Sequence, residues 1–255
     1  MINGKKVIAT IEARMGSSRL PGKMAMELFK GLPALGAVIE RLSACKKLDG
    51  VIVATTEGKE NDAIVDIAKR FAAMYFRGKE DDVLGRVVEA GRAAGADILV
   101  LVTGDASCTS PSLTDEGVDF FIEHDYDFVS NVIETTYPFG IVIQVADHKS
   151  LKKARQMADG KPYRDDTNNF EHTNFFIVNH PDIFKIYEYV APAKYNRPDV
   201  RVALDTAADL DVIRGIYREL YPGNKFFDID DILKLLEEKP YIWSPLEGLN
   251  IKKAA

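Results

Sequence analysis

The amino-terminal stretch at residues 5–23 reads KKVIATIEARMGSSRLPGK and joins an apolar run to a basic loop. Residues 5–13 predict the first strand of the fold, because apolar and β-branched side chains dominate them. The loop that follows carries three cations, Arg14, Arg19 and Lys23, among glycines and serines. Small residues let backbone N–H groups approach an anion, and the cations can donate charge-assisted hydrogen bonds to phosphate oxygens. We therefore expect a phosphate cradle directly after a first strand, with a solvated basic loop as the alternative.

The cradle matches neither of two common phosphate-binding motifs. It is not a G-x-x-x-x-G-K-[ST] loop, which argues against a P-loop ATPase, and it is not a G-x-G-x-x-G turn, which argues against a dinucleotide oxidoreductase.

Short β-branched runs alternate with helical patterns through the first 125 residues, which is typical of a parallel sheet covered by helices. Further strands are expected at 51–56, 74–76 and 98–104, and helices at 62–71, at 83–94 and around Leu35, Val38, Ile39 and Leu42. Later in the chain, strands at 128–132 and 140–146 have no long helix between them, which indicates an antiparallel excursion. A strand at 200–204 and helices at 207–220 and 229–236 follow. The predicted fold class is α/β, a three-layer α/β/α arrangement with a mixed sheet.

The chain has 255 residues, which we interpret as a single domain spanning residues 1–255. Residues 131–198 are interpreted as an inserted segment on the acceptor side, because residues 163–198 are polar and rich in aromatics. This segment is also expected to form the contact of a homodimer, with a lid that packs on its own domain as the alternative.

Charge and hydropathy exclude several classes of partner. Lys and Arg number 33 against 39 Asp and Glu, for a net charge of −6, so no nucleic-acid polymer is expected to bind. The longest apolar runs are far shorter than the roughly 20 residues that cross a bilayer. With no signal-peptide pattern at the amino terminus, we expect a cytoplasmic protein that does not bind a membrane.

Two aspartates follow predicted strands. Asp105 comes after the apolar strand at 98–104, and Asp205 comes after the strand at 200–204. Ligands of α/β sheets bind beyond the carboxyl ends of strands, and Mg²⁺ takes one or two protein carboxylates together with phosphates and water. The two residues are therefore predicted to bind Mg²⁺ as a cofactor, unless Asp105 caps a turn and Asp205 caps the next helix.

The pattern A-R-x-x-S-x-R-L-P-G-K resembles the signature of the cytidylyltransferases that activate acidic sugars, such as acylneuraminate and 3-deoxy-manno-octulosonate cytidylyltransferases. The similarity spans nearly the whole chain and looks closest to the branch of spore coat polysaccharide biosynthesis protein F. Its further motifs are VATT at 53–56, FRG at 76–78, EDDVL at 80–84, TGD at 103–105, SN at 130–131, TYP at 136–138, EH at 171–172 and LDT at 204–206.

The resemblance implies roles for individual residues. Nucleotide binding falls to Ala13, Arg14, Ser17, Arg19, Lys23, Thr55, Arg77 and Asp82; sugar binding falls to Tyr137, Glu171 and His172; and Arg14, Lys23 and Asp105 are the expected catalytic residues. An alternative for Asp82 and Arg86 is a helix cap followed by a solvated helix face.

The implied activity is transfer of a cytidylyl group from CTP to a small acidic 2-keto-3-deoxy sugar, with release of pyrophosphate, for polysaccharide or glycoconjugate synthesis. Two departures from the family fall near the acceptor, at residues 106–111 and 140–145. A non-catalytic nucleotide-binding protein is compatible with these departures. A glycosyltransferase of related fold is a second alternative, although the stretch from Thr103 lacks the second aspartate of a D-x-D metal motif.

Overall fold

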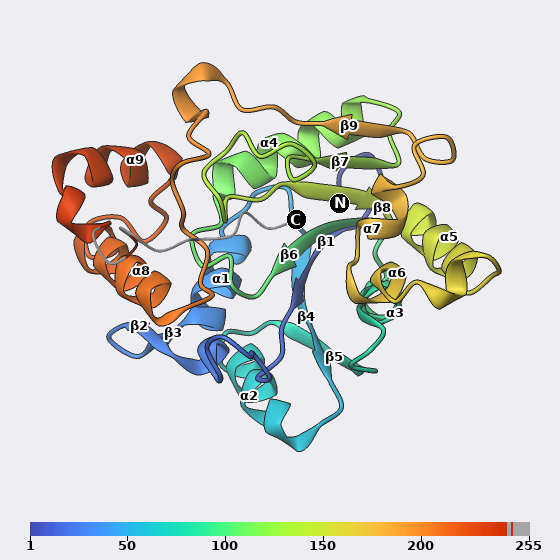
Figure 1. The fold of residues 1–255 in the computed structure, drawn as a ribbon, viewed down its shortest axis with the longest axis horizontal. Helices are drawn as coiled ribbons and strands as arrows, with labels where there is room; N and C mark the ends of the chain where they lie inside the picture. The colour runs from blue at the N-terminus through green and yellow to red at the C-terminus, as the bar shows by residue number, and fades with distance from the viewer. Residues whose placement is uncertain (244–245, 247–255) are drawn as a thin grey trace.

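A central sheet lies between two layers of helices in the computed structural model of the chain, which describes residues 1–243 and 246 (Figure 1). Within the described residues the sheet has seven strands in the order β5-β4-β1-β6-β8-β7-β9. These are β1 (Val7–Glu12), β4 (Gly50–Thr56), β5 (Met74–Gly78), β6 (Ile98–Thr103), β7 (Phe128–Ser130), β8 (Gln144–Asp147) and β9 (Ile186–Glu188). A separate hairpin is formed by β2 (Glu27–Phe29) and β3 (Leu32–Pro33).

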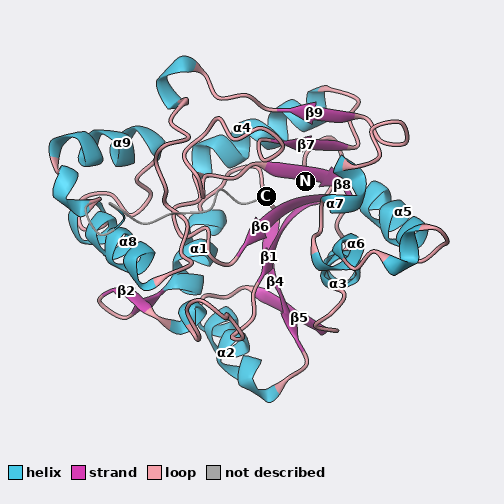
Figure 2. Cartoon of the chain, in the orientation of Figure 1, coloured by secondary structure: helices cyan, strands magenta, loops and turns pink. Residues whose placement is uncertain are grey.

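Helices cover both faces of the sheet (Figure 2). The core cluster on one face includes residues of α1 (Ala34–Ser43), α2 (Asp62–Arg70) and α4 (Pro111–Glu123), and it extends to α8 (Ala207–Leu220) and α9 (Ile229–Glu238). The other face packs against α3 (Val83–Ala94), α5 (His148–Ala158), α6 (Asn168–Glu171) and α7 (Phe175–Val178). The three-layer α/β/α prediction is confirmed.

Strand β1 shows how the alternation of side chains builds the two cores. Val7, Ala9 and Ile11 belong to the core cluster on the α1 face, whereas Ile8 belongs to the cluster on the α3 face. Successive side chains of a strand point to opposite faces, so Glu12 falls on the α3 face as well.

The order and direction of the strands place the site. β1 pairs in parallel with both β4 and β6, and β4 pairs in parallel with β5. The carboxyl ends of these four strands therefore lie along one edge of the sheet. β8 runs antiparallel to both β6 and β7, which confirms the mixed sheet and the antiparallel excursion.

The segment at 131–198 contributes strands to the central sheet and helices to one of its faces. It supplies β8 and β9, and its helices α5, α6 and α7 pack on the α3 face. The strand expected at 140–146 starts only at Gln144, because the Asn131 side chain bonds to the backbone of Ile141 (3.0 Å) and Ile143 (2.8 Å) in place of a strand partner.

The prediction of a strand at 200–204 is wrong. The segment is extended and makes an isolated bridge between Arg201 and Phe139, with the Val202 N–H donating to the Phe139 carbonyl at 2.7 Å. Gly140 has a φ of 104°, and a Cβ there would lie 2.6 Å from the Ala203 nitrogen. The close approach that this glycine permits turns the two segments away from a regular ladder.

No helix in the described part of the chain is long and apolar enough to cross a membrane.

Candidate active site

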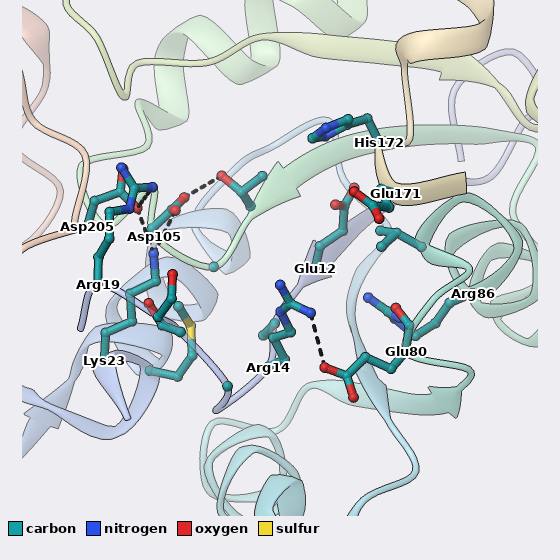
Figure 3. Close-up of a pocket in the computed structure, with 18 of the residues that line it drawn as sticks. Glu12, Arg14, Arg19, Lys23, Glu80, Arg86, Asp105, Glu171, His172 and Asp205 are labelled. Carbon is teal, nitrogen blue, oxygen red and sulfur yellow. Dashed lines mark hydrogen bonds and ion pairs between the residues drawn. The ribbon is translucent and has the colours of Figure 1, made fainter. Parts of the chain in front are cut away.

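A cavity of about 790 Å³ opens at the carboxyl edge of the sheet (Figure 3). It is lined by the end of β1, the cradle loop, the start of α3, the end of β6, the end of α6 and Asp205. Figure 3 shows Arg19, Lys23, Asp105 and Asp205 at one end, and Glu12, Arg86, Glu171 and His172 toward the other. We call these the phosphate end and the inner end of the cavity.

The cradle loop is held in shape by its own backbone and by Asn61. The Gly22 N–H donates to the Met15 carbonyl at 3.1 Å, and the Met15 N–H donates to Asn61 Oδ1 at 2.8 Å. Gly22 has a φ of 75°, a conformation that residues with a Cβ rarely adopt. This turn starts a short 3₁₀ helix and directs Lys23 into the protein.

Lys23 joins the two aspartates that the sequence placed at strand ends. Its Nζ lies 2.9 Å from Asp105 Oδ2, 2.9 Å from Asp205 Oδ1 and 2.9 Å from the Leu204 carbonyl oxygen. The lysine is buried, so its three N–H donors all bind protein oxygens. The ammonium group thus stabilises two carboxylates at the mouth of the cradle.

More cationic side chains pair with Asp205 than with Asp105. Besides Lys23, it pairs with Arg19 at 3.1 Å and with Arg201 at 2.9 Å. Burial raises the pKa of the Asp205 carboxyl, but Lys23, Arg19 and Arg201 outweigh burial, so that the pKa lies below its usual range. This carboxylate stays ionised.

The alternative role of Asp205 as a helix cap is taken by its neighbours. Thr206 is the N-cap of α8, and its hydroxyl accepts from the Asp209 N–H at 3.2 Å in a capping box. The Asp209 carboxylate also pairs with Arg201 at 2.8 Å. Asp205 is therefore free to face the cavity.

Asp105 depends on a close approach between β6 and β1. A Cβ at Gly104 would lie 2.6 Å from the Met24 sulfur and 3.1 Å from the Glu12 carbonyl oxygen. Because glycine has no side chain there, the chain can turn and present Asp105 next to Thr103, whose hydroxyl donates to Asp105 Oδ1 at 2.6 Å.

The donor chemistry of this pair fits Mg²⁺ shared with phosphate oxygens. Two carboxylates face one end of the cavity, and Mg²⁺ usually takes only one or two protein carboxylates when phosphates and water complete its shell. In the described residues no group of three or more His, Cys, Asp and Glu side chains is placed to hold a metal alone. Lys23 and Arg19 balance the negative charge of Asp105 and Asp205, which a bound cation would also balance.

The remaining cradle residues also reach the cavity. Ala13, Arg14 and Ser17 line it, and Arg14 Nη1 pairs with Glu80 at 3.0 Å in an exposed ion pair. Ser17 is part of the turn, since its hydroxyl accepts from the Leu20 N–H at 3.3 Å. The structure therefore brings together all the predicted cradle residues.

The inner end holds Glu171 and His172, which the resemblance assigned to the sugar, together with Glu12 and Arg86. Glu12 lies at the end of β1 and accepts a hydrogen bond from the hydroxyl of Thr173. Burial raises the pKa of Glu12 to about 7, against the opposing influence of Thr173 and Arg86. Arg86 is buried on α3, and burial lowers its pKa while Glu12 raises it.

Four predicted site residues do not line the cavity. Thr55 is buried within β4, and Tyr137 is buried in the core on the α1 face. Arg77 bonds to Asp62 and to the Glu57 and Gly58 carbonyls. Asp82 caps α3 by accepting from the Gly85 N–H at 2.8 Å and pairs with Arg155 at 2.7 Å, which is the structural alternative that its position allowed.

Sequence reasoning assigned no role to Glu12 or Thr173. Glu12 is a carboxylate at the end of an otherwise apolar strand, which was the available signal. No pattern in the sequence marks Thr173, because its hydrogen bond to Glu12 forms only when the chain between α6 and α7 lies over the end of β1.

Comparisons with known proteins identify the family of this chain. The sequence matches the model of the cytidylyltransferase family over residues 8–227. It is 34% identical over 242 residues to an uncharacterized protein of Methanocaldococcus jannaschii, covering 93% of each chain. It is 27% identical over 220 residues to spore coat polysaccharide biosynthesis protein SpsF of Bacillus subtilis, covering 84% of this chain and 87% of that one.

A solved structure shares nearly the whole fold. A cytidylyltransferase from Leptospira borgpetersenii superposes with a TM-score of 0.86 at 28% identity, covering 98% of this chain and all of the other. The family match covers the strands, the cradle and both aspartates, and so the chain belongs to the cytidylyltransferase family.

Proposed function

We propose that the protein transfers the cytidylyl group of CTP to a hydroxyl of a small acidic sugar and releases pyrophosphate. The observation that carries this proposal is the cluster of Lys23, Asp105 and Asp205 at the phosphate end, beside the cradle residues that line the cavity. Such a cluster combines cations for a triphosphate with carboxylates suited to a metal–phosphate complex. The family match and the resemblance to enzymes that activate acidic sugars support the choice of nucleotide and acceptor.

In this reaction the acceptor oxygen forms a bond to the α-phosphorus of CTP. The bond from that phosphorus to the bridging oxygen of the β-phosphate breaks, pyrophosphate leaves, and the acceptor hydroxyl loses its proton. Phosphoryl transfer of this kind depends mainly on positioning and on stabilising charge. Arg14, Arg19 and Lys23 would supply the positive charge, with Arg14 exchanging its exposed partner Glu80 for phosphate oxygens.

We propose Asp105 and Asp205 as the protein ligands of Mg²⁺. When bound, the cation would neutralise charge on the phosphate oxygens. Asp105 and Asp205 would hold the cation, and Lys23, which bonds to both carboxylates, would donate instead to the triphosphate. Lys23 would then act as a mobile cation between protein and substrate.

We place the acceptor sugar beside Glu171 and His172. Both side chains are exposed to the cavity, and within the described residues neither makes a hydrogen bond or an ion pair. Among the departures from the family pattern, the resemblance leads us to expect carboxylates at the positions of Val142 and Gln144, and Gln144 bonds to Asn174 at 2.8 Å. Neither residue lines the cavity.

We also propose that the protein forms a homodimer through the segment at 131–198. Its described residues include three exposed apolar side chains near the ends of β7 and β9, Val132, Ile133 and Val190, which would be covered in a dimer.

The test is pyrophosphate release from CTP and Mg²⁺ with a panel of sugars that includes 2-keto-3-deoxy acids and their neutral counterparts. Release that requires both CTP and one acid supports the proposal. Consumption of a cytidine-diphosphate sugar without pyrophosphate release would instead identify a glycosyltransferase. CTP binding without turnover on any sugar would identify a non-catalytic nucleotide-binding protein.

A further inference from the structure

The inner end of the cavity contains four ionisable side chains that the protein uses only in part. Glu12 comes from β1, Arg86 from α3, and Glu171 and His172 from the end of α6. In the described part of the chain none of the four forms an ion pair with another. Figure 3 shows all four side chains around the same part of the cavity.

Glu12 is fixed in place while one side of its carboxylate stays available. Its backbone carbonyl accepts from the Gly104 N–H at 2.8 Å, and the strand pairs with both β4 and β6 at this position. Thr173 donates to one carboxylate oxygen, Oε1. Within the described residues no hydrogen bond is made by the other oxygen, which belongs to a side chain that lines the cavity.

Arg86 is also incompletely satisfied. It is only 4% exposed, and its Nη1 donates to the Lys79 carbonyl at 2.5 Å. Its Nε is buried and finds no hydrogen-bond partner in the structure. Its Nη2 makes no hydrogen bond within the described residues and is not one of the buried unpaired atoms, so Nη2 is the donor that a ligand in the cavity can reach.

The charges at the two ends decide which part of the substrates fits the inner end. The triphosphate belongs with Arg19 and Lys23 at the phosphate end. We place the acceptor sugar beside Glu171 and His172, and Glu12 would repel the carboxylate of that sugar. Glu12 and Arg86 are therefore left for another part of the substrates. A neutral nucleobase bearing an amino group, by contrast, can donate to a carboxylate and accept from a guanidinium.

We propose that Glu12 selects cytosine over uracil by accepting a hydrogen bond from the exocyclic amino group of the base, with Arg86 donating to the ring carbonyl oxygen that both bases share. The inference rests on the proposed use of CTP. Carboxylates are known to read the amino group of cytosine in this way. Uracil carries a carbonyl oxygen at the same position, which would face the carboxylate without a proton between them.

Binding should be measured above the pKa of Glu12, which burial raises to about 7. At pH 8 the carboxylate is mostly ionised and can only accept hydrogen bonds. Titration calorimetry at this pH should give a Kd for CTP at least about tenfold lower than for UTP, the size expected of one well-paired base contact.

The decisive variant is Glu12→Gln, which keeps the shape and can turn its amide to donate to uracil or accept from cytosine. We expect the preference for CTP to fall to about threefold or less, mainly through tighter UTP binding. Thr173→Val removes the hydrogen bond that orients Glu12 and should reduce the preference by at least about threefold. The matched control is Glu89→Gln, a half-buried position on the same helix as Arg86 that does not line the cavity, pairs with Arg92 and should leave the preference unchanged.

The outcomes separate this inference from the proposed function. If wild-type protein binds neither nucleotide, the proposed function is wrong and the inference falls with it. If CTP binds but UTP binds equally well, or if Glu12→Gln keeps the wild-type preference, cytidylyl transfer can stand and the role of Glu12 is wrong. Should Glu12→Gln fail to fold, an unchanged preference in Thr173→Val would overturn the inference in its place.

Discussion

Lys23 Nζ lies 2.9 Å from Asp205 Oδ1, although 182 positions separate the two residues in the chain. The lysine belongs to the cradle that follows β1, and the aspartate precedes α8, so this contact joins the two halves of the protein at the site. Asp105, at the end of β6, meets the same ammonium group. One cation therefore links three segments that each follow or precede a regular element.

Replacing Lys23 with methionine should weaken both the fold and nucleotide binding. The loss leaves Asp105 and Asp205 partly uncompensated, which typically costs about 3 kcal/mol for a buried pair and less where the pair is partly exposed, as here. It also removes a charge-assisted phosphate contact worth roughly 1.5 to 3 kcal/mol. Thermal unfolding and CTP calorimetry measure the two effects. Lys23→Arg, which keeps the charge, is the matched control, and unchanged CTP affinity in Lys23→Met would show that the cradle does not bind the triphosphate.

Asp105→Asn and Asp205→Asn should each abolish turnover across a Mg²⁺ titration, because the amide keeps the size of the side chain and loses its charge. Asp205→Asn should also lower stability, since Arg19 and Arg201 lose a partner along with Lys23. Asp211→Asn is a suitable control because Asp211 is exposed on α8. Full activity of both site variants at every Mg²⁺ concentration would mean that the two residues only stabilise the fold.

Glu12 should make the protein less stable as the pH rises from about 4.5 to about 7. Its pKa in the folded protein is about 7, above the ordinary value of 4.5, so the folded state binds more protons than the unfolded state in this window. Stability therefore falls with rising pH and levels off above 7. Glu12→Gln removes this cost and should exceed the wild type in stability at pH 8 by up to about 3 kcal/mol. Denaturant unfolding at pH 5 and pH 8 tests this, and an equal difference at the two pH values would contradict it.

The cradle and the two aspartates could be predicted because their signals are local. A basic loop rich in glycine and serine that follows an apolar strand indicates a phosphate site without reference to the rest of the fold. An acidic residue that follows a predicted strand indicates a ligand site in the same way. The cradle and Asp105 meet because β1 and β6 are parallel neighbours whose carboxyl ends share one edge. Asp205 follows an extended segment that is not a strand, and it is held at the site by Lys23 and Arg201. The helix at 207–220 was predicted with its observed bounds, although its N-cap is Thr206, in a capping box with Asp209, and not Asp205.

Other features depend on contacts that the sequence does not reveal. Asp82 and Tyr137 stand in motifs of the family, yet one caps α3 and pairs with Arg155, and the other is buried. The extended segment at 200–204 has the residues of a strand but meets Gly140 and forms a bridge instead of a ladder. Glu12 acquires its raised pKa only when α3 and the residues after α6 enclose the end of β1.

The last prediction concerns the homodimer that we propose through the segment at 131–198. Ile133 is 47% exposed and Val190 is 54% exposed, at neighbouring ends of β7 and β9, and β9 is the edge strand of the sheet. Apolar side chains at such a place are typical of an interface core, and a charge introduced there would have to be buried on association. Light scattering at micromolar concentration should report about twice the monomer mass of 28.3 kDa for the wild type. Ile133→Lys and Val190→Lys should shift the mass toward that of the monomer, while Met74→Lys should leave the dimer intact, because Met74 is an exposed apolar residue on β5 at the opposite edge of the sheet. A wild-type protein that is monomeric and fully active would contradict the dimer and favour a segment that packs only on its own domain.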